Sequence, residues 1–364
     1  MIFDRIKKMS NVLMKKIDKI EVDSNKCLKV RSVISSCQAC MDVCPANSIQ
    51  IKQDSLELED TCLACGLCTA VCPTNALKWN DPPLIQLYNQ LTRMLEKEQI
   101  VYVACSTSFQ HNRNVNVMEV PCFGMLPTEF WVSLGKYASY LRILHDSNHC
   151  TTCKIPNGEN LFMEQLQKAE RLLEISFQIV STIHEESEND VEEIDHNRRR
   201  FLSSIFEEVK ETNTIAVKEA LEVNKTLSPF EKFDRYYQQQ NEVEAIADEV
   251  NEIKETVVHQ LLSDAVTHTD KRELLLNTFK KSDKLQAEMN FLMPEINENC
   301  TRCGACSFLC PTDALYADGK DIILATSKCV SCQLCVEICY EKHISLVPKS
   351  GTIFNNKFMY LLKE

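Results

Sequence analysis

One cysteine pattern, repeated four times, limits what this chain can fold into more than any other feature. The clearest copy is CLACGLCTAVCP, from Cys62 to Pro73, in which two, two and three residues separate the four cysteines. The same spacing occurs from Cys300 to Pro311 and again from Cys329 to Cys339, where Tyr340 stands in place of the proline. An altered copy runs from Cys27 to Pro45 and ends in SCQACMDVCP. Such spacing predicts sites at which several sulfurs bind one metal centre.

The spacing has a physical reason. Two residues between cysteines wrap one turn of backbone around a compact inorganic core, so that thiolates converge and backbone N–H groups point at the sulfurs. Gly66 and Gly304 lie where a positive φ and a close approach of the backbone are needed. A proline after the fourth cysteine turns the chain out of the site. Tyr340 removes that turn signal but no ligand, so we expect the fourth copy to be intact.

Residues 27 to 79 and 297 to 347 closely resemble the two-cluster bacterial ferredoxins. The resemblance implies two dicluster modules, four 4Fe-4S cubes, and crossed ligation, in which the fourth cysteine of each run binds the neighbouring cube. Carried over by position, it groups Cys62, Cys65 and Cys68 with Cys44; Cys27, Cys37 and Cys40 with Cys72; Cys300, Cys303 and Cys306 with Cys339; and Cys329, Cys332 and Cys335 with Cys310.

Cys27 departs from this pattern. Nine residues separate it from Cys37, and Ile34 stands where the spacing expects a cysteine. One interpretation is that a loop over residues 28 to 36 carries Cys27 back to its cube. The other is a cube with three protein thiolates and an open iron. We favour the loop, because Cys27 has no other evident partner nearby.

Composition restricts the class of protein. The chain has 364 residues, 44% of them hydrophobic, and no run of 18 apolar residues, which argues against a membrane span. A net charge of −12 argues against nucleic acid as a partner, because phosphates would be repelled. Twenty cysteines without an apparent export signal indicate a reducing compartment. We therefore expect a cytoplasmic protein whose cysteines bind metal.

Between the modules, the pattern changes to alternating short strands and helices. Strand-type runs lie at residues 100–104, 115–120, 140–144 and 175–180, and helical periodicity occurs at residues 84–98, 128–138 and 161–174. This alternation predicts an α/β domain with a parallel sheet.

Four further cysteines follow the predicted strands. Cys105 follows the first strand, Cys122 the second, and Cys150 and Cys153 the third. The carboxyl ends of parallel strands share one edge of a sheet, so we expect these thiols to lie close together and to bind metal.

The order of these residues resembles the iron-sulfur delta subunit of methanogen-type hydrogenases that feed heterodisulfide reductase. The residues that carry the resemblance are YVACSTS, VPCFGM, HDSNHCTTC and NGENLF. It implies a 2Fe-2S cluster, although two residues between Cys150 and Cys153 are fewer than the family suggests. Zinc and plain reduced thiols remain alternatives. His145 and His149 are candidate ligands too, but a histidine without a metal is the commoner case.

Helical periodicity is predicted for much of the rest of the chain. Residues 1–22 predict a basic amphipathic helix that packs on its own protein, with peripheral contact to an anionic membrane as the alternative. Amphipathic helices are also expected around Phe201–Val209 and Leu261–Val266. The predicted order is an amphipathic helix (1–26), a dicluster module (27–80), an α/β domain (81–182), a helical segment (183–296), a dicluster module (297–350) and a tail (351–364). The fold class is thus α+β multidomain, with two ferredoxin-like modules flanking a parallel-sheet domain and a helical segment.

Several cubes along one chain indicate a path for single electrons to or from a redox enzyme. The donor and the acceptor are not evident. An iron-sulfur carrier, assembly or redox-sensing scaffold is one alternative. The other is an oxidoreductase subunit with its own substrate site, although no phosphate-binding glycine loop is present. Apolar neighbours are expected to shield the cubes: Ile49, Leu67, Val71, Leu77, Phe308, Leu309, Leu315, Leu334 and Ile338.

Overall fold

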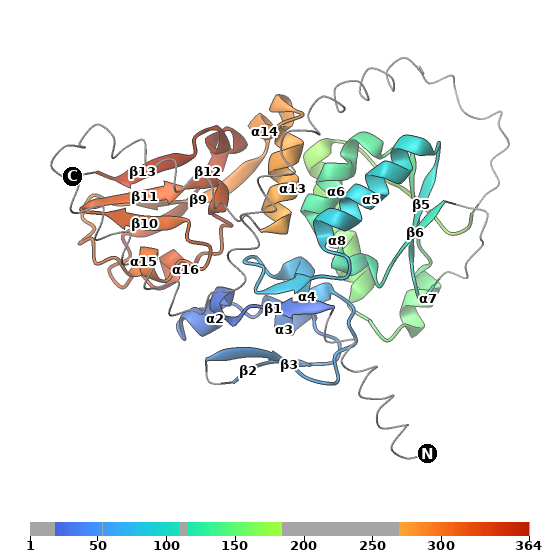
Figure 1. The fold of residues 1–364 in the computed structure, drawn as a ribbon, viewed down its shortest axis with the longest axis horizontal. Coiled ribbons are helices and arrows are strands. Elements are labelled where there is room, and N and C mark those ends of the chain that lie inside the picture. The colour runs from blue at the N-terminus through green and yellow to red at the C-terminus, as the bar shows by residue number, and fades with distance from the viewer. Residues whose placement is uncertain (1–18, 53, 109–115, 184–268, 364) are drawn as a thin grey trace, which may run out of the picture. The chain divides into compact units, whose positions relative to one another are not determined.

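The computed structural model describes residues 19–52, 54–108, 116–183 and 269–363 (Figure 1). All of these belong to one compact unit of the chain. The predicted helix over residues 1–18 lies outside the described residues, and so do the amphipathic faces at Phe201–Val209 and Leu261–Val266. None of the described helices combines the length and apolar character that a membrane crossing requires.

The first cysteine-rich module is built from short elements around two antiparallel strand pairs. Strand β1 (Ile20–Val22) pairs with β4 (Leu77–Trp79), and β2 (Ile49–Lys52) forms a hairpin with β3 (Ser55–Leu58). The cysteine runs supply the one-turn helices of the module, which are α2 (Leu28–Arg31), α3 (Ala39–Val43) and α4 (Leu67–Val71).

The second module repeats this plan. Strand β9 (Asn290–Ile296) pairs with β12 (Ile344–Ser350), and β10 (Leu315–Asp318) forms a hairpin with β11 (Asp321–Ala325). Helices α15 (Ala305–Phe308) and α16 (Leu334–Glu337) lie within the two cysteine runs. A further strand, β13 (Phe358–Leu362), pairs with the free edge of β11.

Between the modules in sequence lies a four-stranded parallel sheet, as predicted. Its order is β6 (Val117–Val120), β5 (Val101–Cys105), β7 (Leu141–Leu144) and β8 (Gln178–Val180), and every pairing is parallel. The helices that accompany it are α5 (Leu84–Lys97), α6 (Thr128–Leu134), α7 (Ser147–Thr152) and α8 (Gly158–Leu173).

Aromatic side chains fill the core of this domain. Trp131 is fully buried, and its ring centroid lies 5.9 Å from Phe130, 5.8 Å from Phe162 and 5.7 Å from Phe177. Helix α5 buries Leu84, Leu87, Leu91 and Leu95 at the helical spacing read from the sequence. These side chains belong to one hydrophobic core that also includes Cys68 and Cys72 of the first module.

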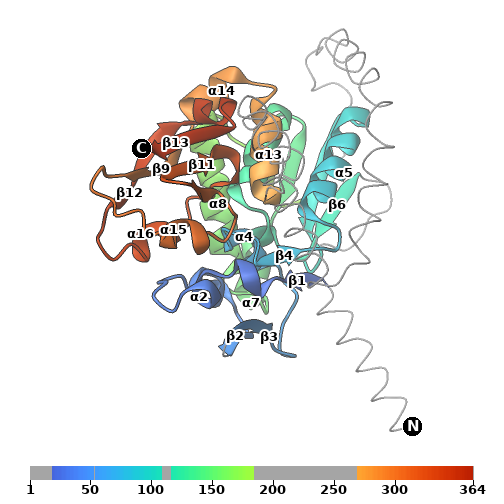
Figure 2. The same cartoon turned by 60° about the vertical axis from the view of Figure 1, so that its left-hand side comes forward.

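Helix α13 (Asp270–Phe279) comes from the end of the predicted helical segment and packs against α5 and α6 (Figures 1 and 2). Thr269 caps it by accepting a hydrogen bond from the Arg272 N–H. Leu274, Leu275 and Phe279 form its buried face. A short helix, α14 (Asp283–Glu288), follows and leads into β9.

Two local expectations were wrong. Residues 20–22 form strand β1 and not the end of a helix, because Ile20 is buried where β1 pairs with β4. Residues 290–296 form strand β9 and not a continuing helix, because they pair along their full length with β12. The segment expected only as a tail (351–364) contains regular structure, since Gly351–Asn355 form a 3₁₀ helix and β13 completes a three-stranded sheet.

Candidate metal-cluster sites

The first module brings Cys27, Cys37, Cys40 and Cys72 together. Burial raises the pKa of Cys40 to about 12, and the negative charges of Cys72, Cys37 and Cys27 raise it further. Burial also raises the pKa of Cys37, with Cys72 and Cys27 again contributing. The residues between Cys27 and Cys37 form helix α2 and a turn, and this excursion returns the chain to the other three thiols. The Cys72 thiol thus lies with the preceding run.

A second group contains Cys62, Cys65, Cys68 and Cys44. Burial raises the pKa of Cys65, and the thiolates of Cys62 and Cys44 raise it further. Cys68 has its pKa raised well above the usual value by burial and then by Cys65 and Cys62, followed by the more distant Cys40 and Cys44. The influence of Cys40 on Cys68 shows that the two groups of this module are neighbours.

In the second module the Cys310 thiol likewise lies with the other cysteine run. Burial raises the pKa of Cys332 to about 12, with Cys310 and Cys329 adding to the shift, so Cys310 lies with the later run. Burial raises the pKa of Cys306 to about 11, helped by Cys300 and Cys303. Cys339 packs on the same apolar core as Cys306. Cys335 is influenced by Cys306 as well as by its own group, so these groups are also neighbours.

A backbone pattern surrounds the thiols and repeats between runs. In each run, the residue three positions after the fourth cysteine has a positive φ. In three of the four runs, the backbone N–H of the next residue donates to the sulfur of that fourth cysteine at 3.3 Å. These donors are Ser48 to Cys44, Ala314 to Cys310, and His343 to Cys339. In three runs, the residue two positions after the first cysteine also has a positive φ. In two of these runs its N–H donates to the sulfur of that first cysteine at 3.4 Å, from Ala64 to Cys62 and from Arg302 to Cys300.

These donor sets fit iron-sulfur clusters. Four thiolates in one buried group repel one another, and a bound cation compensates their charge; the thiolate is the form that binds metal. Hydrogen bonds from backbone N–H groups to sulfur are typical of iron-sulfur sites. The structure therefore supplies converging sulfurs together with the donors that stabilise their charge.

Most of the apolar side chains expected to cover the clusters are buried or partly buried, but the expectation for Phe308 was wrong. Leu67, Leu77 and Leu334 are buried beside the cysteine runs. Phe308, in contrast, is 82% exposed, because α15 is only one turn long and its ring points away from the core. Phe308 therefore does not shield a cluster.

A third type of site lies at the carboxyl edge of the parallel sheet. A small cavity there is lined by all four cysteines predicted to meet, which are Cys105, Cys122, Cys150 and Cys153. Burial raises the pKa of Cys122 to about 12, with the charges of Cys105, Cys65 and Cys153 contributing. Because Cys65 belongs to the first module, this edge site and that module are neighbours.

Two further side chains enter the edge site from its rim. The Nε2 atom of His145 lies 3.6 Å from the Cys150 sulfur and 3.4 Å from a Glu159 carboxylate oxygen. Ligand atoms of His145, Cys150 and Glu159 all lie within 4.8 Å of one another, a spacing that suits a metal ion. His149 also lines the cavity. The sequence pointed to both histidines, whereas Glu159 was missed because a glutamate near a helix start carries no distinctive signal.

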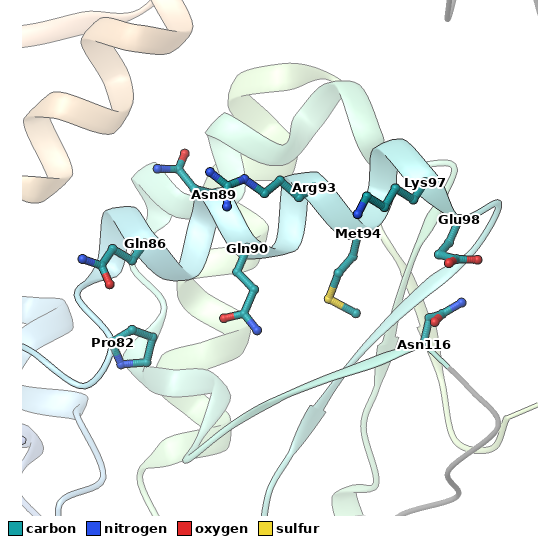
Figure 3. Close-up of a pocket in the computed structure, with 9 residues that line it drawn as sticks. All are labelled: Pro82, Gln86, Asn89, Gln90, Arg93, Met94, Lys97, Glu98 and Asn116. Carbon is teal, nitrogen blue, oxygen red and sulfur yellow. The ribbon is translucent and has the colours of Figure 1, made fainter. Parts of the chain in front are cut away.

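A separate surface hollow of about 590 Å³ lies along α5 (Figure 3). Its lining is mainly polar side chains such as Gln86, Gln90 and Arg93, with Asn116 from the start of β6. None of the cysteines lines it.

Comparison with known proteins identifies the cysteine-rich parts. Residues 34–81 match the LdpA Fe-S cluster-binding domain, and residues 293–340 match the 4Fe-4S dicluster domain. A "Ferredoxin-like protein in nif region" from Sinorhizobium fredii is 36% identical over 55 residues, which cover 86% of that protein and 15% of this chain. The chain belongs to the ferredoxin-like iron-sulfur proteins. No solved structure matches it significantly.

The ferredoxin-like assignment makes this an iron-sulfur protein of the electron-transfer type. It covers the cysteine runs but not the parallel sheet, for which these matches offer no counterpart. The resemblance of the sheet to a hydrogenase subunit thus remains an expectation. Cys27 lies outside the matched residues as well, so its role rests on the geometry described above.

The edge site of this ferredoxin-like protein depends on one glycine. A Cβ at position 158 would lie 2.5 Å from the Cys122 sulfur and 3.2 Å from Ile155. We expect Gly158→Ala to displace Cys122 and to lower the metal content of the edge site at least several-fold, while leaving the iron of the two modules in place. Metal analysis with EPR of the purified protein measures both. Glu164→Ala, on the exposed side of the same helix, is the control; metal retained in full by Gly158→Ala contradicts the role of this glycine.

Proposed function

We propose that the chain relays single electrons through four 4Fe-4S clusters held as two crossed pairs. The observation that supports it best is the crossing itself: Cys72 lies with Cys37 and Cys40, and Cys310 lies with Cys329 and Cys332. Crossed ligation is the arrangement of two-cluster ferredoxins, and it brings two clusters of each module close together.

When bound, each cluster accepts and releases one electron. The chain's own residues hold and tune it. Converging thiolates supply the ligands, N–H groups such as those of Ser48 and Ala314 stabilise charge on sulfur, and buried leucines exclude water. Burial of a charged cluster disfavours further reduction, whereas N–H donors favour it, so their balance sets the potential.

The neighbouring groups suggest an order for the path. The edge site is next to the group of the first module that contains Cys65, and that group is next to the group that contains Cys40. In the second module, the group that contains Cys335 is next to the group that contains Cys306. Cys303 is exposed, so the last group lies near the surface, where a partner can dock. We propose redox enzymes or their subunits as donor and acceptor, in the cytoplasm.

For the edge site we propose a fifth centre of the 2Fe-2S type, held by Cys105, Cys122, Cys150 and Cys153. Four sulfurs around one small cavity favour a cluster, and the neighbouring Cys65 supports a position next to the path. Zinc is the competing occupant, since four thiolates suit it equally well.

Anaerobic purification tests the proposal. About sixteen irons per chain are expected for four cubes, and about two more for a 2Fe-2S centre, with EPR signals that appear on reduction without any substrate. Cys122→Ser is expected to remove one signal and spare the cubes. Zinc at the edge site with unchanged EPR in Cys122→Ser overturns the fifth redox centre; clusters that move to an apo-acceptor in place of cycling between redox states overturn the relay.

A further inference from the structure

Two consecutive basic residues at the start of α13 have buried side chains. Lys271 is 8% exposed and Arg272 is 6% exposed. Lysine and arginine are rarely buried this deeply unless an anion or a set of acceptors compensates the charge. Nothing in the sequence singled them out, because a Lys-Arg pair in a helical region is usually a solvated face.

Lys271 reaches into the first module. Its ammonium donates to the backbone oxygens of Ala70 and Cys72, each at 2.6 Å. Both acceptors belong to the end of the second cysteine run, and the Cys72 thiol lies with Cys37 and Cys40. The positive charge thus acts most strongly on the group of Cys72, and more weakly on Cys68 of the neighbouring group.

Arg272 reaches into the second module. Its guanidinium donates to the Cys329 backbone oxygen at 2.6 Å and lies over two aromatic rings, 4.9 Å from Phe291 and 4.6 Å from Phe354. The Nε and Nη1 atoms are buried without a hydrogen-bond partner. Because an unsatisfied buried donor is costly, these atoms indicate an acceptor beyond those that the described residues supply.

Nearby carboxylates do not neutralise the positive charges of Lys271 and Arg272. No carboxylate of a described residue forms an ion pair with either cation; Asp270 pairs with Lys78 at 3.4 Å, and Glu129 is the other acidic group near them. Glu337 approaches the first module from the other side, close to Cys37, but it is partly exposed and therefore screened by solvent. We therefore expect the buried cations to exert the stronger field on the clusters.

We propose that Lys271 and Arg272 form the junction between the two modules, which means the point at which an electron passes from a cluster of one module to a cluster of the other. Each cation stabilises the extra negative charge of a reduced cluster, Lys271 at the group of Cys72 and Arg272 at the group of Cys329. These two clusters are therefore reduced before the other two, and one electron passes between them without any bond being formed or broken. The inference rests on the proposed relay function and adds where the modules connect and which residues set the order of reduction.

The test is an anaerobic EPR-monitored redox titration of the full chain. Lys271→Met and Arg272→Met remove one charge each at similar side-chain volume. Each is expected to lower the reduction equilibrium constant of one cluster, a different one in each variant, by about tenfold or more, which is about 59 mV for a one-electron couple. Lys271→Arg, which keeps the charge, is expected to restore the potential. Lys284→Met, at an 83% exposed side chain on α14, is the matched control and is expected to change nothing.

The outcomes separate this inference from the function on which it rests. Wild-type protein without about sixteen irons contradicts the relay itself. Full iron with unchanged potentials in both Met variants overturns the junction and leaves the relay intact. If a Met variant does not assemble its clusters, the wild-type titration decides: two clusters reduced clearly before the other two support the junction, and a single common potential overturns it.

Discussion

Removal of iron is expected to unfold both cysteine-rich modules while the parallel-sheet domain stays folded. The modules are made of strands of three to seven residues and one-turn helices such as α4, far below the length at which a helix is stable alone. Burial raises the pKa of ligand thiols such as Cys40 and Cys332, with neighbouring cysteines adding to the shift, so without a metal these groups lose the interaction that organises them. For structural zinc sites the metal-linked folding free energy is on the order of 10 kcal/mol, and the same coupling is expected here.

Hydrogen exchange with and without a chelator, under reducing anaerobic conditions, measures this effect by region. Amides of residues 20–79 and 290–362 are expected to lose protection on iron removal. Amides of β5 and β7 are expected to keep it, because their core is formed by aromatic groups such as Trp131 and Phe162. Protection that survives in both modules after complete loss of iron contradicts the prediction.

The second large effect is expected at Cys27. Cys27→Ala is expected to cost between one and four irons per chain and to abolish or convert one of the four reduced-cluster signals. The physical reason is that α2 returns Cys27 to Cys37, Cys40 and Cys72, so a fourth thiolate is lost from that group. Iron analysis and EPR of the anaerobic protein give both readouts.

Val33→Ala is the matched control, because Val33 is 94% exposed in the same excursion of the chain and its loss disturbs no thiol. Cys27→Ala protein with full iron and four unchanged signals contradicts ligation by Cys27. That result favours the cube with three protein thiolates and an open iron.

The sequence predicts the cysteine turns and the sheet well, because both follow from local spacing, whereas the assignment of each cysteine to a cube comes from the ferredoxin resemblance and stays a prediction. Two- and three-residue gaps dictate the cysteine turns, and apolar runs alternating with helical periods indicate parallel strands. The meeting of Cys105, Cys122, Cys150 and Cys153 also follows from strand order, since all three loops leave the same edge. That these residues bind metal remains a prediction.

What the sequence does not reveal are long-range pairings. Strand β1 exists because β4, more than fifty residues later, offers an edge, and β13 exists because β11 does. Phe308 has the apolar side chain of a shield, yet it lies on the outer side of a single helical turn. Lys271 and Arg272 look like surface residues, because only the packed structure places backbone carbonyls of two modules around their cations.

The excursion between Cys27 and Cys37 also touches the second module. Arg31 donates to the Phe308 backbone oxygen at 3.2 Å, and the Ser36 N–H and hydroxyl donate to the Glu337 carboxylate. Both contacts come from the extra residues of the irregular run, and both end inside the other module's cysteine runs. We therefore expect that loss of the cluster held by Cys37 and Cys40 would also loosen these contacts, so that damage in one half is felt in the other.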